Sequence, residues 1–146
     1  MDADLERFVD AQRGVHDGAS AELRRGRKVG HWIWFVFPQI AGLGRSEMSR
    51  QYAIASLEEA KAYVAHPVLG PRLREAASAL LAAPAGRSAL QILGEIDATK
   101  VRSSMTLFHR AAPDELLFRA VLDRFYDGRP DTATDRLLAS ASDEVG

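Results

Sequence analysis

The chain has 146 residues, of which 47% are hydrophobic and 27% charged, and its formal net charge is −1. This balance is typical of one globular domain and excludes a disordered chain, while the near-zero charge argues against bulk electrostatic binding of nucleic acid. The lack of cysteine excludes disulfides and thiolate metal sites. No apolar segment is long enough for a membrane span or a signal peptide, so a cytoplasmic protein without a membrane partner is expected.

The first third of the chain predicts two short helices and an aromatic segment. Apolar spacing predicts a helix over residues 2–12 and another over residues 19–25, which Gly26 terminates. Residues 31–37 include four aromatic side chains and predict a short buried helix or an irregular core segment, because a single strand would have no partner. Trp32 and Trp34 are two positions apart, so we expect one in the core and the other near a pocket wall.

The rest of the chain is predicted to be a succession of helices. Their expected ranges are 46–55, a helix starting at 56, 73–81, 88–93, 97–108, 114–126 and 131–138. Asp97 and Asp131 are the predicted N-caps of two of them. The helix over residues 114–126 has two apolar stripes, which predict a central position and contact with the 73–81 stripe. Together these patterns predict a compact all-α domain of about seven to nine short helices over residues 1–139, followed by a frayed tail at 140–146.

Several motifs resemble those of an uncharacterised bacterial family. They are HWIWFVFPQ at residues 31–39, GLGRS at 42–46, YAI at 52–54, Glu59-Ala60 and SSMTLF at 103–108. The similarity extends from about Phe8 to Leu138. Members of this family are all-helical single domains that are sometimes labelled calpastatin-like. The resemblance implies a compact all-α fold and no established activity.

A basic stretch supplies the candidate binding site. Residues 23–50 contain six basic residues and one acidic residue, whereas residues 113–146 contain eight acidic and four basic residues. Guanidinium and ammonium groups beside indole rings suit an anionic, nucleotide-like metabolite, and the GLGRS turn would present free N–H groups at a helix start. The candidate ligand-binding residues are Arg27, Lys28, His31, Trp34, Gln39, Arg45 and Ser46. The alternative is that the aromatic residues are core and the basic residues a solvated turn.

Two other functional classes remain open at this point. The protein could be an enzyme at the same site, with His31 as general acid or base and with Lys100 or Ser104 assisting. It could instead be an interaction module whose basic face binds an acidic partner or its own acidic C-terminal third. The histidine spacing shows no metal-binding pattern, so no metal and no cofactor are predicted. A monomer or weak homodimer is expected.

Overall fold

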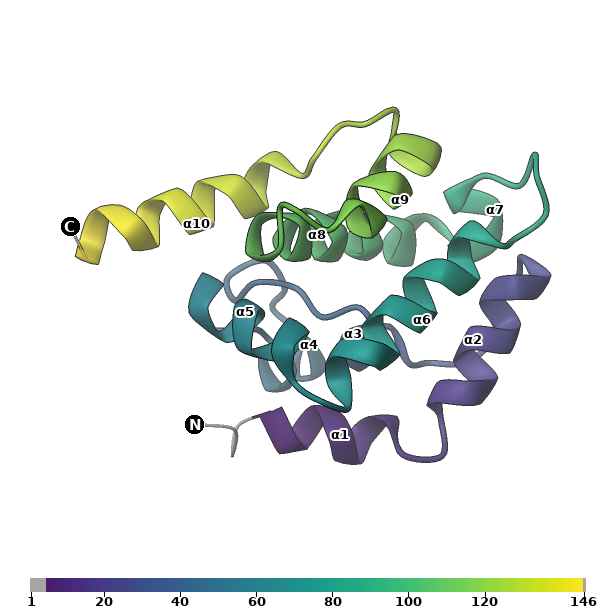
Figure 1. Cartoon of the computed structure of the whole chain (residues 1–146), viewed down its shortest axis with the longest axis horizontal. Helices are drawn as coiled ribbons and strands as arrows, with labels where there is room; N and C mark the ends of the chain where they lie inside the picture. The colour runs from purple at the N-terminus through teal and green to yellow at the C-terminus, as the bar shows by residue number, and fades with distance from the viewer. Residues whose placement is uncertain (1–4, 146) are drawn as a thin grey trace.

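The computed structural model describes residues 5–145 and contains ten helices in this range (Figure 1). They are α1 (Glu6–Gln12), α2 (His16–Arg25), α3 (Ile33–Val36), α4 (Glu47–Gln51), α5 (Leu57–Ala65), α6 (Leu69–Leu81), α7 (Ala89–Leu93), α8 (Glu95–Ala111), α9 (Leu116–Tyr126) and α10 (Thr132–Val145). The predicted all-α class is confirmed, with slightly more helices than expected. Within the described residues, no helix has the length and apolar character needed to cross a bilayer.

The aromatic segment folds as the short buried helix that the sequence predicts. Helix α3 buries Ile33, Phe35 and Val36. Trp32 is only 2% exposed, whereas Trp34 is half-buried and lines a surface hollow, as expected from their spacing. The chain then leaves the helix at Phe37 and forms a single parallel bridge between Ile40 and Ile54.

Helix α8 is the central helix of the described fold, and it contacts α3, α5, α7, α9 and α10 (Figure 1). Its residues 103–108 are all buried. The Thr106 hydroxyl donates a hydrogen bond of 2.8 Å to the Arg102 carbonyl one turn earlier, which satisfies its polar group inside the core. The prediction that the 114–126 helix is central is therefore wrong. Ser103, Ser104 and Thr106 of α8 are polar but buried, so the hydropathy pattern did not indicate the central position of this helix.

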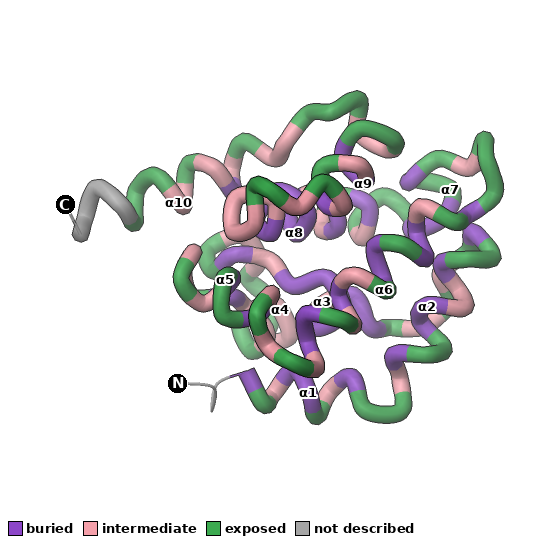
Figure 2. Tube along the Cα trace, in the orientation of Figure 1, coloured by how far each residue is buried: buried purple, intermediate pink, exposed green. Residues whose placement is uncertain are grey.

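The predicted contact between the 114–126 and 73–81 segments is confirmed, since the two helices that they form pack together. Helix α9 packs against α6. Phe118, Val121 and Leu122 of α9 are buried, while Leu116 at its start is 72% exposed. Figure 2 shows buried stretches in α6, α8 and α9, and α9 packs against both of the other helices. Helix α9 thus has one buried face rather than an apolar circumference.

Several helix ends differ from their predicted positions, and three of them change how named residues are interpreted. Helix α4 ends at Gln51 rather than near Ala55, because Ile54 is drawn into the core, where its N–H bonds the Gln39 carbonyl at 2.8 Å. Helix α8 begins at Glu95, so Asp97 lies in its first turn and is not its N-cap. Helix α10 continues past Leu138 to Val145, where the sequence predicts a frayed tail, and Gly146 lies outside the described residues.

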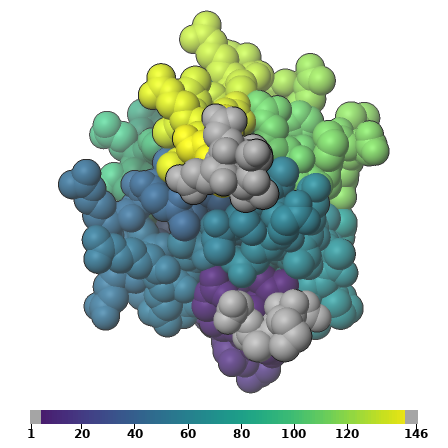
Figure 3. Space-filling model, turned by 90° about the vertical axis from the view of Figure 1, so that its left-hand side faces the viewer, coloured from purple at the N-terminus to yellow at the C-terminus, as the bar shows by residue number. Residues whose placement is uncertain are grey.

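Helix α10 lies over the loop that follows α3. Leu137 and Leu138 share a surface hollow with Ile40 and Ala41. Figure 3 shows the yellow helix against the blue segment from the side of the molecule. Gly42, at φ +105°, lies beneath Leu137, and a Cβ there would come within 3.2 Å of its side chain. This glycine serves the contact with α10.

Candidate functional site

Two neighbouring hollows lie along the N-terminal half of α8, and Glu95, Ile96 and Lys100 line both of them. The Trp34 hollow has a volume of about 500 Å³, and its other lining residues are Lys28, His31, Ile33, Trp34, Leu93, Gly94 and Asp97. The Gln39 hollow has a volume of about 450 Å³, and its other lining residues are Gln39, Leu43, Gly44, Ser49, Thr99, Ser103, Asp131 and Ala133. Both volumes lie in the range of small-molecule sites.

An ion pair forms one wall of the Trp34 hollow. Lys28 Nζ lies 2.8 Å from Asp97 Oδ2, and the two side chains are 8% and 19% exposed. Lys28 Nζ also donates a hydrogen bond to the Gly30 carbonyl. The ammonium group therefore already has two acceptors from the chain. Lys28 is held in place by them rather than presented to a ligand.

Glu22 of α2 holds the loop that carries Lys28 and His31. Its Oε1 accepts hydrogen bonds from the backbone N–H groups of Val29 at 2.6 Å and Gly30 at 2.9 Å, and from Trp32 Nε1 at 3.1 Å. Partial burial opposes ionisation of this carboxyl, but the three hydrogen bonds outweigh burial and lower the pKa of Glu22. An ionised Glu22 thus holds the loop between Lys28 and His31, two residues that line the hollow.

Lys100 stands between the two hollows and is the least neutralised cation there. Its Nζ lies 4.9 Å from the centre of the Trp34 ring and 3.8 Å from Asp97 Oδ1. The side chain is 19% exposed. Among the described residues, Lys100 Nζ makes no hydrogen bond. Trp34 Nε1 is buried and also lacks a hydrogen-bond partner. The Lys100 ammonium group thus lies over an indole whose N–H has no partner.

Asp131, one of the two acidic residues that line the Gln39 hollow, is already satisfied by the chain. Asp131 Oδ2 accepts hydrogen bonds from the Thr134 N–H at 3.0 Å, the Thr134 hydroxyl at 2.6 Å and the Ser103 hydroxyl at 3.1 Å. The predicted N-cap role of Asp131 at α10 is confirmed by the first of these bonds. Its carboxylate is thus engaged in holding α8 and α10 together.

The structure brings together only part of the predicted site. Lys28, His31 and Trp34 line one hollow and Gln39 lines the other. The remaining predicted ligand-binding residues line neither hollow and are exposed: Arg27, Arg45 and Ser46. Of the weak catalytic candidates, Lys100 lines both hollows, whereas Ser104 is fully buried and lines neither of them.

The turn before α4 is occupied by its own side chains. The Ser46 hydroxyl accepts a hydrogen bond of 3.1 Å from the Ser49 N–H, as its predicted capping role requires. Gly44 lies so close to Ser49 that a Cβ would come within 2.4 Å of the serine side chain. The glycine therefore allows the turn to pack closely against α4.

Sequence reasoning did not assign several of the lining residues to the site, among them Glu95, Ile96, Thr99 and Asp97, the partner of Lys28. The spacing of Asp97 and Lys100 does place both residues on one helix face, and this much can be inferred from the sequence. The contact of Asp97 with Lys28 depends on the packing of distant segments. No pattern along the chain reveals that contact.

This fold and these hollows define an all-helical domain whose activity is not established. The family model described as "Protein of unknown function (DUF1810)" matches residues 2–138, and the chain belongs to this family. A solved relative is the conserved hypothetical protein Rv1873 from Mycobacterium tuberculosis, whose crystal structure was determined at 1.38 Å. The two share 50% sequence identity and a TM-score of 0.90 over 93% of this chain and 96% of that chain. No curated protein matches the chain significantly.

Proposed function

We propose that the protein binds a small anionic metabolite in the two hollows beside α8, with Lys100 as the main cationic contact. The observation that carries this proposal is the sharing of one carboxylate by two ammonium groups. Asp97 lies 2.8 Å from Lys28 Nζ but 3.8 Å from Lys100 Nζ. Because Asp97 is closer to Lys28, Lys100 keeps a positive charge in a half-enclosed place, and a phosphate or carboxylate would neutralise it. The Glu95 carboxylate, which also lines both hollows, opposes the anion and limits its affinity.

Trp34 supports a ligand that also has a planar ring. Its indole lies beneath the Lys100 ammonium group and forms a wall of the hollow. Ile96, which is 72% exposed, adds apolar surface at the rim. The indole N–H can only donate, so an oxygen atom of a ligand that displaced the covering atoms would satisfy it. A nucleotide-like metabolite combines such a ring with such an oxygen.

Thermal denaturation with added anions tests this proposal. Inorganic phosphate, pyrophosphate and AMP would each be titrated at low and high salt, since a ligand that binds the native state raises the Tm. We expect a saturable rise with at least one of them, weakened by salt. Lys100→Gln should weaken the affinity at least about tenfold, a loss of about 1.4 kcal/mol of binding free energy.

The matched control is Lys61→Gln. Lys61 is a half-exposed lysine of α5, paired with Glu58 at 3.6 Å, and lies outside both hollows. This variant should respond to anions as the unchanged protein does. The proposal is contradicted if no anion raises the Tm at millimolar concentration, or if Lys100→Gln responds as strongly as Lys61→Gln.

Catalysis by His31 has weaker support than binding. His31 lines the Trp34 hollow but is exposed, and among the described residues no hydrogen bond or ion pair orients its ring. A general acid or base needs a fixed position against the reacting group. We therefore propose binding alone.

A further inference from the structure

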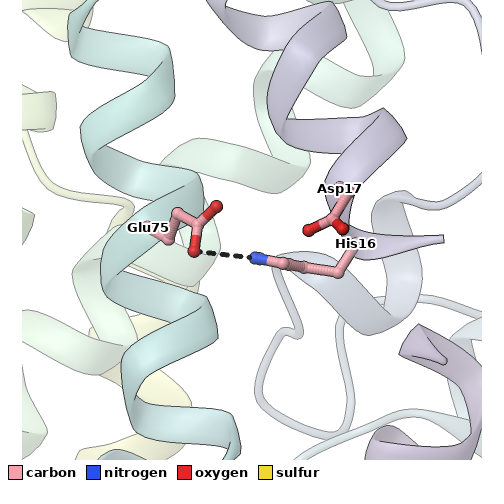
Figure 4. A group of neighbouring side chains, drawn as sticks. All are labelled: His16, Asp17 and Glu75. Carbon is pink, nitrogen blue, oxygen red and sulfur yellow. Dashed lines mark ion pairs between the residues drawn. The ribbon is translucent and has the colours of Figure 1, made fainter. Parts of the chain in front are cut away.

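A second group of ligand-type side chains lies between α2 and α6. His16 and Asp17 are the first two residues of α2, and Glu75 reaches toward them from α6 (Figure 4). One ligand atom from each of the three residues lies within 4.8 Å of the other two. Imidazole nitrogen and carboxylate oxygen are the donors that zinc and related divalent metals prefer.

The imidazole of His16 points into this group with an unsatisfied nitrogen. The residue is only 8% exposed, and its Nε2 is buried without a hydrogen-bond partner. Nε2 faces the Glu75 carboxylate, with Oε2 3.4 Å away (Figure 4). A nitrogen lone pair and a carboxylate repel each other unless a cation, either a proton or a metal ion, lies between them.

The 3.4 Å between Nε2 and Oε2 is compatible with two ligands of one tetrahedral zinc ion, which stand about 3.3–3.4 Å apart when each is about 2.0–2.1 Å from the metal. Ion pairs elsewhere in the structure have similar separations, such as Arg13 and Asp10 at 3.3 Å, so the proposal rests on the buried, unpartnered Nε2 rather than on this distance. The three ligand atoms lie within 4.8 Å of one another, so the exposed carboxylates of Asp17 and Glu75 would close in on the bound ion. We propose that His16, Asp17 and Glu75 bind one divalent transition-metal ion, for which Zn²⁺ is the appropriate probe.

The surroundings leave the proposed ligand atoms free. Arg24 pairs with the other oxygen of Glu75, Oε1, at 3.7 Å, which orients the carboxylate with Oε2 toward His16. Arg72 lines the adjoining hollow of about 140 Å³ together with His16 and Asp17, and its Nη1 lies 3.4 Å from Gln12 Oε1. These two arginines oppose a dication, so we expect moderate affinity.

Three protein ligands leave one coordination position for water or a substrate atom. Catalytic zinc sites have this arrangement, whereas structural zinc sites are usually closed by four protein ligands. The ion would also link the start of α2 to the middle of α6. Zinc should therefore stabilise the fold as well as supply a bound water.

Calorimetric titration of the metal-free full chain with Zn²⁺ tests the proposal. We expect one ion per chain and a rise in Tm. His16→Gln and Glu75→Gln should each weaken the affinity at least about tenfold, because each removes one of three ligands. Glu75 is half-exposed, with 47% of its side chain accessible, so its variant folds even if the buried His16→Gln does not. The matched control is Glu58→Gln, whose side chain is 83% exposed on α5.

Each other outcome overturns the assignment. If the unchanged protein binds no zinc at millimolar concentration, the group is an ion pair between His16 and Glu75 alone. If the His16→Gln and Glu75→Gln variants bind zinc as Glu58→Gln does, the ion is held by other surface groups. Binding of anions at Lys100 is measured separately, and neither result affects the other proposal.

Discussion

Lys28 Nζ lies 2.8 Å from Asp97 Oδ2, and this ion pair joins the loop after α2 to the first turn of α8. The Lys28 side chain is 8% exposed, and Asp97 is the carboxylate with which it forms an ion pair. The same carboxylate is 3.8 Å from Lys100 Nζ. The pair therefore fixes the wall of the Trp34 hollow and leaves Lys100 as the cation available to a ligand.

Removing this carboxylate should destabilise the fold. In Asp97→Asn the nearly buried Lys28 ammonium group loses the carboxylate of its ion pair, and we expect the free energy of unfolding to fall by about 2–3 kcal/mol. Urea denaturation measures this change. Asp123→Asn is the control, because Asp123 forms an exposed pair with Arg119 at 3.8 Å. It should cost less than about 0.5 kcal/mol, and an equal loss in the two variants would contradict the role of the pair.

The two tryptophans should differ in their contribution to stability. Trp32→Ala removes a side chain that is 2% exposed and should cost about 3–5 kcal/mol. Trp34 is half-buried at the wall of a hollow, so Trp34→Ala should cost less than half as much. Chemical denaturation of the two variants gives both values. Equal costs would show that Trp34 is a core residue and not a wall of the hollow.

A buried and an exposed leucine of α9 should also differ in their contribution to stability. Leu122 is 2% exposed and Leu116 is 72% exposed. Leu122→Ala should cost about 2–5 kcal/mol, because it removes buried apolar surface and leaves a cavity. Leu116→Ala should change the free energy of unfolding by less than about 0.5 kcal/mol. If Leu122→Ala is as mild as Leu116→Ala, the described contact of α9 with the core is wrong.

His109 should make stability depend on pH. Burial, helped by the nearby charge of Arg110, lowers the pKa of the His109 imidazole below its usual value of about 6.5. The unfolded chain therefore takes up this proton more readily than the folded chain does. The contribution of His109 is present above about pH 6.5 and is lost as the pH falls toward the lowered pKa. His109→Gln should flatten this part of the profile, and an unchanged slope would contradict it.

Local signals in the sequence predicted local structure well. Gly26 ends α2 at φ +80°, and the Ser56 and Ser88 hydroxyls accept hydrogen bonds at the starts of α5 and α7. These features depend on neighbouring residues, so the chain reveals them directly. The same applies to the division of roles between Trp32 and Trp34, which follows from their spacing.

Contacts between distant segments were not predictable in this way. Ser103 and Ser104 read as polar, yet α8 carries them into the centre of the fold. Likewise, the local sequence favours Asp97 as an N-cap. Its ion pair with Lys28 joins two segments that are distant in the sequence, so no local pattern indicates it. The sequence therefore pointed toward Arg45 and Ser46, which line neither hollow, and did not indicate that α8 lines both of them.

The most direct test of the proposed function follows the two indole N–H resonances in ¹⁵N-labelled protein. The chain has two tryptophans, and Trp34→Phe identifies the peak of Trp34. During titration with phosphate, pyrophosphate or AMP, the Trp34 peak should shift saturably, while that of Trp32, whose Nε1 is bonded to Glu22, should stay in place. Lys100→Gln should raise the Kd of this shift at least about tenfold. A Trp34 peak that no anion moves, or one that moves equally in Lys100→Gln, would contradict binding at this site.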